Sequence, residues 1–213
     1  MGIWYHKKIL MTIFFLIVLI FSVIIHEIAH GSVAYSLGDP TAKYSDRLTL
    51  NPLKHLDPFG SVILPIIMLI FTGGRGPIIG WAKPVPINPY NFRDQKWGEL
   101  KVALAGPATN ILIGIIFGLM IRFVSLPDSL LALFSIISIY NFLLAVFNLI
   151  PIPPLDGSHI LFSFLPESFS RIKIILQQYS LILLLILIFF GLDWVFYIVQ
   201  TLFFFFAGKP ISI

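Results

Sequence analysis

The chain has 213 residues, of which 58% are hydrophobic and only 11% charged, and its formal net charge is +4. A typical soluble domain has about 45–50% apolar and about 25% charged residues, so this chain has too few polar side chains to cover a water-exposed surface. The composition indicates an integral membrane protein, and it excludes disordered, collagen-like and nucleic-acid-binding classes.

The first predicted element is a membrane span. Residues 9–37 are almost entirely apolar and exceed the length of about 20 residues that a bilayer requires. Aromatic and basic residues between positions 4 and 8 precede the span as interface anchors. The run is too long for a signal-peptide core and no small-residue cleavage site follows it, so we expect it to be retained.

Two unusual segments follow a polar stretch that ends at Pro58. Residues 60–72 are apolar, but 13 residues are few for a span and Pro65 lies among them, so we expect a re-entrant segment. Residues 73–91 are rich in glycine and proline and are not expected to be helical. Their alternation is compatible with an edge strand, where proline costs little. We therefore expect a short membrane-associated β element.

The rest of the chain holds four more apolar runs. They cover residues 100–124, 130–150, 174–191 and 194–206. We expect the first of them to break within Ala105–Asn110, which contains Pro107, and a proline-rich stretch at 151–157 to interrupt the helical pattern after the second. The sequence thus predicts an all-α polytopic membrane protein with about five to six transmembrane or re-entrant segments, folded as a single domain over residues 1–213.

The distribution of positive charge predicts the orientation. Most lysines and arginines fall in segments 38–59 and 73–101, whereas Lys7, Lys8 and Arg122 fall on the opposite side. Cytoplasmic loops carry the excess of positive charge, which places the first group in the cytoplasm, although the basic N-terminus opposes this assignment. We expect a multi-pass protein of a cell membrane whose segment 60–72 enters and leaves on the cytoplasmic face.

The strongest chemical signal is His26-Glu27-Ile28-Ala29-His30. On a helix, residues four apart share a face, so both imidazoles can reach one metal ion. Glu27 lies beside them and can take a proton from water without binding the metal. The alternative is a pair of packing histidines with a structural glutamate. We favour the metal site, because three ionisable groups in an apolar span are costly and mark function.

A third ligand is needed, because two imidazoles leave a tetrahedral site incomplete. The chain has no cysteine, and the remaining candidates are Asp57, Asp156, Glu99, His55 and His159. We favour Asp156, because the prolines before it break the helix and expose backbone groups. At membrane depth that is tolerated only around a buried or watered cavity. The alternative is an aspartate that caps a helix starting near Ser158.

These motifs resemble those of site-2 proteases, a family of intramembrane zinc metalloproteases, in their compact bacterial form without PDZ or CBS domains. The resemblance covers most of the chain. It rests on His26-Glu27-x-x-His30, Gly106-Pro107-x-x-Asn110 and Asn148-x-x-Pro151-x-Pro153-Pro154-Leu155-Asp156-Gly157, and on segments 51–58 and 80–86. The resemblance implies one Zn²⁺ ion held by His26, His30 and Asp156, with Glu27 as the general base.

The resemblance also implies that Asn110 and Asn148 lie near the substrate or its oxyanion, where an amide donor can stabilise the tetrahedral intermediate. An interhelical hydrogen bond is the alternative for each. The edge strand of the family would correspond to residues 80–89, where an unwound substrate can pair with the backbone. His55 and Asp57 either orient a zinc ligand or form an aspartate turn, and we favour the turn.

The function predicted from these features is hydrolysis of a peptide bond in or near a transmembrane helix of a membrane-protein substrate, as in regulated intramembrane proteolysis. The predicted partners are that substrate and the lipid bilayer. Three alternatives remain: a metal transporter, a non-catalytic binding partner, and a membrane-bound peptidase that acts on soluble proteins. A transporter needs several weak sites along a path. A non-catalytic relative would normally have lost Glu27.

Overall fold

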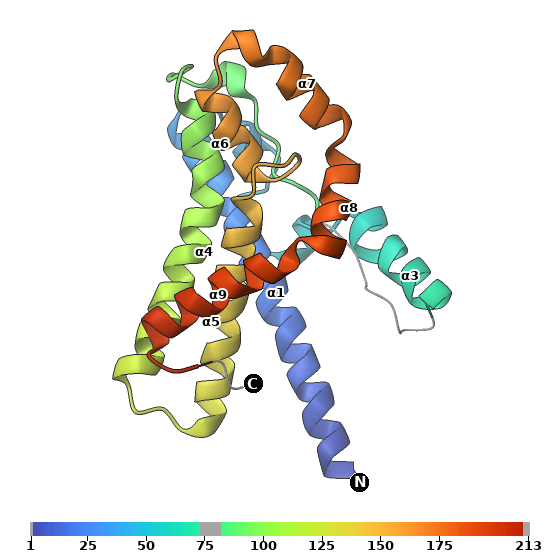
Figure 1. Ribbon diagram of the computed structural model, residues 1–213, viewed down its shortest axis with the longest axis vertical. Coiled ribbons are helices and arrows are strands. Elements are labelled where there is room, and N and C mark those ends of the chain that lie inside the picture. Colours follow the sequence, from blue (N-terminus) through green and yellow to red (C-terminus); the bar gives the residue numbers. More distant parts are fainter. Residues whose placement is uncertain (1, 73–81, 211–213) are drawn as a thin grey trace.

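The computed structural model describes residues 2–72 and 82–210 (Figure 1). Three long helices stand side by side and form its bundle: α1 (Gly2–Ser36), α4 (Gly98–Phe123) and α5 (Asp128–Asn148). Each is long and apolar enough to cross a membrane, although in α1 the spanning stretch begins only at Ile9. The three predicted spans are therefore confirmed as helices of the required length, with ends within a few residues of those expected.

Shorter helices surround this bundle. They are α2 (Thr41–Tyr44), η1 (Pro52–Lys54), η2 (Pro58–Ile63), α3 (Leu64–Thr72), η3 (Pro89–Asn91), α6 (Asp156–Phe164), η4 (Glu167–Phe169), α7 (Ser170–Gln178), α8 (Ser180–Phe190) and α9 (Leu192–Ala207). Helices α7 and α8 meet at an angle of 65° and count as a fourth span only if taken together. The predicted five to six segments are thus not confirmed: the described residues hold three candidate spans, or four with this bent pair.

Helix α4 runs antiparallel to α1. Val102, near the start of α4, contacts His30, whereas Asn110, two turns later, contacts Ser22, which precedes His30 on α1. The link between the two helices, residues 37–97, consequently begins and ends at one end of the bundle (Figure 1). The helical segment 58–72 lies within this link, and its entry and exit on one face remain a prediction.

The expected break in the second span is wrong. Helix α4 continues through Pro107, whose ring is fully buried between neighbouring helices. A proline removes one hydrogen bond from a helix, but neighbouring helices and small local adjustments tolerate this loss inside a membrane bundle. Close packing therefore keeps α4 helical here, although proline locally disfavours a helix interior.

The expected β element is not observed either, since the described part of the chain contains no strand. Of the range 80–89, residues 80 and 81 lie outside the described residues, and 82–88 run irregularly to the 3-10 turn η3. A strand needs a neighbouring backbone, and the prolines at 84, 86 and 89 have no N–H to offer one. The backbone groups of this segment pair with the side chains of Glu27, Asp39 and Arg47 and with the backbone carbonyl oxygen of His55 instead.

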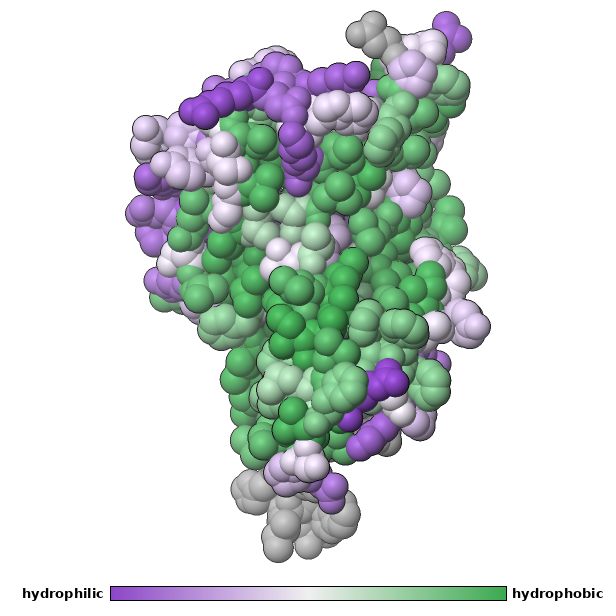
Figure 2. All heavy atoms as spheres, turned by 90° about the vertical axis from the view of Figure 1, so that its left-hand side faces the viewer, coloured by the Kyte–Doolittle hydropathy of each residue, from purple (hydrophilic) through white to green (hydrophobic). Residues whose placement is uncertain are grey.

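The main hydrophobic core lies where α9 crosses α4 and α5. Phe142, Val195 and Phe203 are almost completely buried in it. Gly114 allows the close approach of α5, because a Cβ at this position would lie 2.7 Å from the Phe142 ring. Figure 2 shows a broad apolar surface over the middle of one face, with hydrophilic residues above it and a smaller hydrophilic group at the lower right. This distribution is typical of a protein surrounded by lipid.

Candidate functional site

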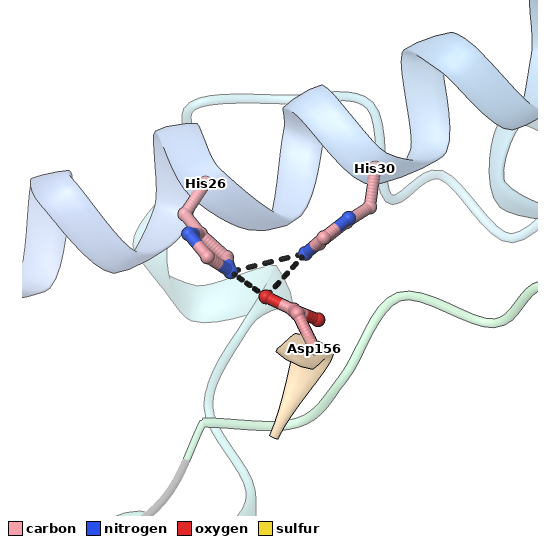
Figure 3. A group of neighbouring side chains, drawn as sticks. All are labelled: His26, His30 and Asp156. Atoms are coloured by element: carbon pink, nitrogen blue, oxygen red, sulfur yellow. Dashed lines mark hydrogen bonds and ion pairs between the residues drawn. The ribbon is translucent and has the colours of Figure 1, made fainter. Parts of the chain in front are cut away.

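Three side chains from two distant segments converge near the upper end of α1. His26 and His30 lie one turn apart on α1, and Asp156 is the first residue of α6. The two imidazole Nε2 atoms are 3.0 Å apart, and Oδ2 of Asp156 lies 3.0 Å from Nε2 of His26 and 3.3 Å from Nε2 of His30 (Figure 3). Both histidines are buried, and the Asp156 side chain is 19% exposed.

The turn between α5 and α6 brings Asp156 to the histidines. Helix α5 ends at Asn148, and the proline-rich residues that follow redirect the chain before α6 begins. Gly157 permits a very tight turn, because a Cβ there would lie 2.2 Å from the carbonyl oxygen of Leu149. The N-cap position of α6 is held by Leu155, and Asp156 is already the first residue of the helix. Its carboxylate faces the histidines, so the capping alternative does not describe this residue.

The hydrogen bonds at Nδ1 of His26 and His30 determine which ring nitrogen of each histidine carries the proton. The carbonyl oxygen of Val102 only accepts, so Nδ1 of His30, 2.6 Å away, must donate to it. Nδ1 of His26 lies 2.5 Å from Oδ1 of Asn110, which also accepts. A neutral imidazole carries one N–H, and both Nε2 atoms therefore present lone pairs.

With both imidazoles neutral, three acceptor atoms meet here with no donor between them, which is unfavourable unless a cation or a proton lies among them. In a tetrahedral site with zinc–ligand bonds of about 2.0–2.1 Å, the ligand atoms are about 3.3 Å apart. The observed separations of 3.0, 3.0 and 3.3 Å agree with this value. The residues present fit a zinc ion.

Gly106 keeps the space beside the ligand atoms open. A Cβ at this position of α4 would lie 2.4 Å from Nε2 of His30 and 2.5 Å from Nε2 of His26. These are close to metal–ligand distances, so a side chain here would compete with the ion for its place. The sequence analysis placed Gly106 in a helix break and in the motif Gly106-Pro107-x-x-Asn110, and the structure shows its close approach to both ligand atoms.

Glu27 lies on the same helix but outside this cluster. Its Oε2 accepts a hydrogen bond of 2.8 Å from the backbone N–H of Val85, in the irregular segment 82–88. Its Oε1 has no hydrogen-bond partner among the described residues. Glu27 thus directly follows His26 on α1, with one carboxylate oxygen hydrogen-bonded to the backbone of Val85.

Three anchors tie segment 82–88 to the stretch that follows α1, residues 39–55. The buried guanidinium of Arg47 donates to the carbonyl oxygens of Lys83 and Pro84, at 2.9 and 3.1 Å. The N–H of Lys83 donates to the carbonyl oxygen of His55, at 2.9 Å. At the other end, the N–H of Asn88 donates to the buried carboxylate of Asp39, at 2.7 Å.

Asp39 organises several donors at once. Its carboxylate also accepts from the Thr41 hydroxyl and from the Asn91 amide, the latter at 2.8 Å. Burial raises the pKa of Asp39, but these hydrogen bonds outweigh burial and hold that pKa below its usual range. Asp39 was not among the predicted site residues, because Gly38-Asp39-Pro40 is a typical pattern for the end of a helix.

The two asparagines predicted near the substrate have different surroundings. Asn110 is completely buried, and its amide donates to Oδ1 of Asn141 and to the carbonyl oxygen of Ser22. With both donors engaged, it contacts His26 rather than offering an N–H to an oxyanion. Asn148 lies at the end of α5 and donates to the carbonyl oxygen of Leu144, at 2.9 Å. Its role toward a substrate remains a prediction.

His55 and Asp57 lie outside the hydrogen-bond network of the cluster. Asp57 accepts from the N–H of Gly60 at 2.6 Å and caps η2, which agrees with the favoured interpretation as a turn. His55 is buried, and its Nε2 donates to the carbonyl oxygen of Thr49 at 2.8 Å. In the described part of the chain, neither side chain is hydrogen-bonded to a candidate ligand. The hydrogen-bond partners of the two histidines are Asn110 and the carbonyl oxygen of Val102 instead.

Comparisons with known proteins agree with this chemistry. The sequence model of Peptidase family M50 matches residues 125–187. “Putative zinc metalloprotease YwhC” of Bacillus subtilis (strain 168) is 38% identical over 183 residues, which cover 82% of this chain and 79% of that protein. “Putative zinc metalloprotease Rip2” of Mycolicibacterium smegmatis is 32% identical over 171 residues, 78% of this chain and 63% of the relative.

A third relative is longer than this chain. “Zinc metalloprotease MJ0392” of Methanocaldococcus jannaschii is 28% identical over 178 residues, which cover 83% of this chain but only 42% of that protein. The chain therefore spans less than two thirds of both the second and the third relative. No solved structure is significantly similar to this chain.

Proposed function

Because this chain belongs to peptidase family M50 and is a zinc metalloendopeptidase, we propose that it cleaves membrane-protein substrates in or near a transmembrane helix, as in regulated intramembrane proteolysis. The observation that carries the proposal is the place of the cluster along α1. His26 and His30 lie within the candidate membrane span Ile9–Ser36, and His26 precedes its end by ten residues, about 15 Å at 1.5 Å per residue. Ligands inside a membrane-spanning helix are suited to a peptide bond inside the bilayer.

In this proposal His26, His30 and Asp156 hold one zinc ion. When bound, zinc makes water nucleophilic near neutral pH and polarises the scissile carbonyl. The two imidazoles contribute Nε2 lone pairs because their Nδ1–H groups donate hydrogen bonds to Asn110 and Val102, which keeps the protons on Nδ1. The Asp156 carboxylate supplies the negative charge that partly balances the ion.

Glu27 is the proposed general base. The Val85 N–H orients the carboxylate through Oε2, which leaves Oε1 to accept a proton from the attacking water. The same carboxylate then passes the proton to the nitrogen of the leaving amine. A substrate backbone unwound along segment 82–88 would lie beside this carboxylate, because Val85 already contacts it.

The proposed location is a cell membrane, with the site open toward the cytoplasm. This orientation is supported by exposed lysines and arginines in the link 37–97, including Lys43, Lys54 and Arg93, at the end of the bundle nearest the cluster. An excess of such charges marks the cytoplasmic side of membrane proteins. The link is also where the anchors of segment 82–88 lie.

The test is cleavage in liposomes by the purified zinc-loaded protein. A reporter with its scissile bond in a transmembrane helix should be cut, whereas a soluble peptide of the same sequence should be cut far more slowly. Glu27→Gln should retain zinc and lose about 10²–10⁴-fold in rate. Equal cleavage of both substrates would contradict the intramembrane assignment. Zinc flux without cleavage would support the transporter instead.

A further inference from the structure

We propose that Asn141, in α5, is a positioning residue for the zinc site, which sets the orientation of the Asn110 amide and thereby the tautomer of His26. The inference rests on the proposed role of His26 as a zinc ligand. Asn110 and Asn141 are 0% and 1% exposed, so water does not satisfy their amides. Hydrogen bonds to other protein atoms therefore set the orientation of both side-chain amides.

The carbonyl oxygen of Ile137 fixes the orientation of Asn141. A carbonyl only accepts, so the side-chain atom of Asn141 that lies 2.8 Å from it must be the amide nitrogen Nδ2. The same nitrogen donates to the hydroxyl oxygen of Ser22, on α1, at 3.0 Å. The other atom of this amide, Oδ1, must then face Asn110.

Asn141 in turn fixes the orientation of Asn110. Because Oδ1 of Asn141 only accepts, Asn110 presents Nδ2 to it, at 2.8 Å. This nitrogen also lies 3.3 Å from the carbonyl oxygen of Ser22, a longer contact. The remaining atom of the Asn110 amide, Oδ1, therefore faces Nδ1 of His26, 2.5 Å away.

The orientation of the Asn110 amide affects zinc binding by His26. An acceptor at Nδ1 of His26 keeps the proton on that nitrogen and leaves the Nε2 lone pair for zinc. Without Asn141, the Asn110 amide loses its shorter partner and can turn over. An Nδ2 group facing His26 would favour the tautomer with the proton on Nε2, which cannot bind zinc. An interhelical hydrogen bond without this role would affect stability and leave zinc affinity unchanged.

The experiment measures the zinc affinity of the purified full chain by competition with a chelator. Asn141→Leu, which keeps the size and removes the amide, should raise the zinc dissociation constant about tenfold, the lower end of the range for outer partners of metal ligands. Asn110→Ala should raise it further. In the Asn110→Ala background, Asn141→Leu should have no additional effect, because Asn141 acts through Asn110.

Ser138→Ala is the matched control. It removes another buried hydrogen bond of α5, from the Ser138 hydroxyl to the carbonyl oxygen of Gly114 at 2.8 Å, and should leave zinc affinity unchanged. Asn141→Ala replaces Asn141→Leu if the latter does not fold. Unchanged affinity in a folded Asn141 variant, or losses that add in the double variant, would overturn the inference.

The outcomes also separate this inference from the proposed function. His26→Ala serves as the reference, and wild-type zinc affinity in that variant would remove the ligand assignment and this inference with it. The affinity measurements need no substrate. A protein that binds zinc tightly but does not cleave the membrane reporter would therefore overturn the proposed function, while the variants would still decide the role of Asn141.

Discussion

The backbone N–H of Val85 donates a hydrogen bond of 2.8 Å to Oε2 of Glu27, although 58 residues separate the two in sequence. Val85 lies between Pro84 and Pro86, which have no N–H, so it supplies the single backbone donor of that tripeptide. The segment is held by Arg47 and Asp39 as well. Val85 is therefore a fixed donor that orients the proposed general base.

The first prediction concerns this donor. Val85→Pro removes the N–H and should lower kcat by about 10- to 100-fold, because a hydrogen bond to a charged group is among the stronger ones. KM and zinc content should change little. Val85→Ala is the control: it shortens the side chain, keeps the N–H and should retain most of kcat. Cleavage of the membrane reporter at several substrate concentrations gives both constants, and normal kcat in Val85→Pro would contradict the role.

The second prediction compares two aspartates. Asp156→Ala should lower the zinc content of the purified protein sharply, because two imidazoles leave the site without its carboxylate ligand. Asp57→Ala should leave zinc nearly unchanged, since the Asp57 carboxylate caps η2. Metal analysis of both variants after identical dialysis measures the effect. The opposite order would show that the third ligand has been misassigned.

The third prediction concerns the space at Gly106. Gly106→Ala places a methyl group 2.4–2.5 Å from both Nε2 atoms, so zinc binding should be lost or weakened by at least about tenfold. Gly118→Ala is the control on the same helix. A Cβ at position 118 would lie 2.9 Å from Cβ of Phe206 and not against a histidine. Gly118→Ala should therefore lower the stability of the fold without lowering zinc affinity. Equal zinc affinity in both variants would count against the assigned position of the ion.

The fourth prediction concerns acid stability. The pKa of Asp39 is lowered in the folded protein, so its stabilising effect is present above the pKa of the unfolded chain and is lost as pH falls through the folded value. Thermal unfolding of zinc-free protein should show wild type more stable than Asp39→Asn near neutral pH. The difference should shrink below about pH 4. A stability difference between wild type and Asp39→Asn that stays constant down to pH 3 would contradict the lowered pKa of Asp39.

The fifth prediction concerns topology. The native chain has no cysteine, so single cysteines can be labelled without background. Cysteines at Lys43, Lys83 and Arg93 should react with an impermeant reagent only from the cytoplasmic side, whereas one at Arg122 should react from outside. Labelling of Lys43→Cys and Arg93→Cys from opposite sides would make segment 58–72 a true span.

Several expectations failed where local preference and packing disagree. Pro107 was expected to break a span, yet burial between helices keeps α4 continuous. Residues 80–89 were expected to include an edge strand, yet in the described part, 82–88, backbone groups pair with Glu27, Asp39 and Arg47. In both cases the deciding partners are distant in sequence, and no local pattern contains them.

The sequence by itself determined the membrane class, the three long spans and the pairing of His26 with His30, because hydrophobic length and helical periodicity are local properties. Only the tertiary structure decided which of five candidates meets the two histidines, since the turn before α6 sets where Asp156 arrives. It also decided that Asn110 faces His26, because an amide has two different ends and only its partners on α1 and α5 choose between them.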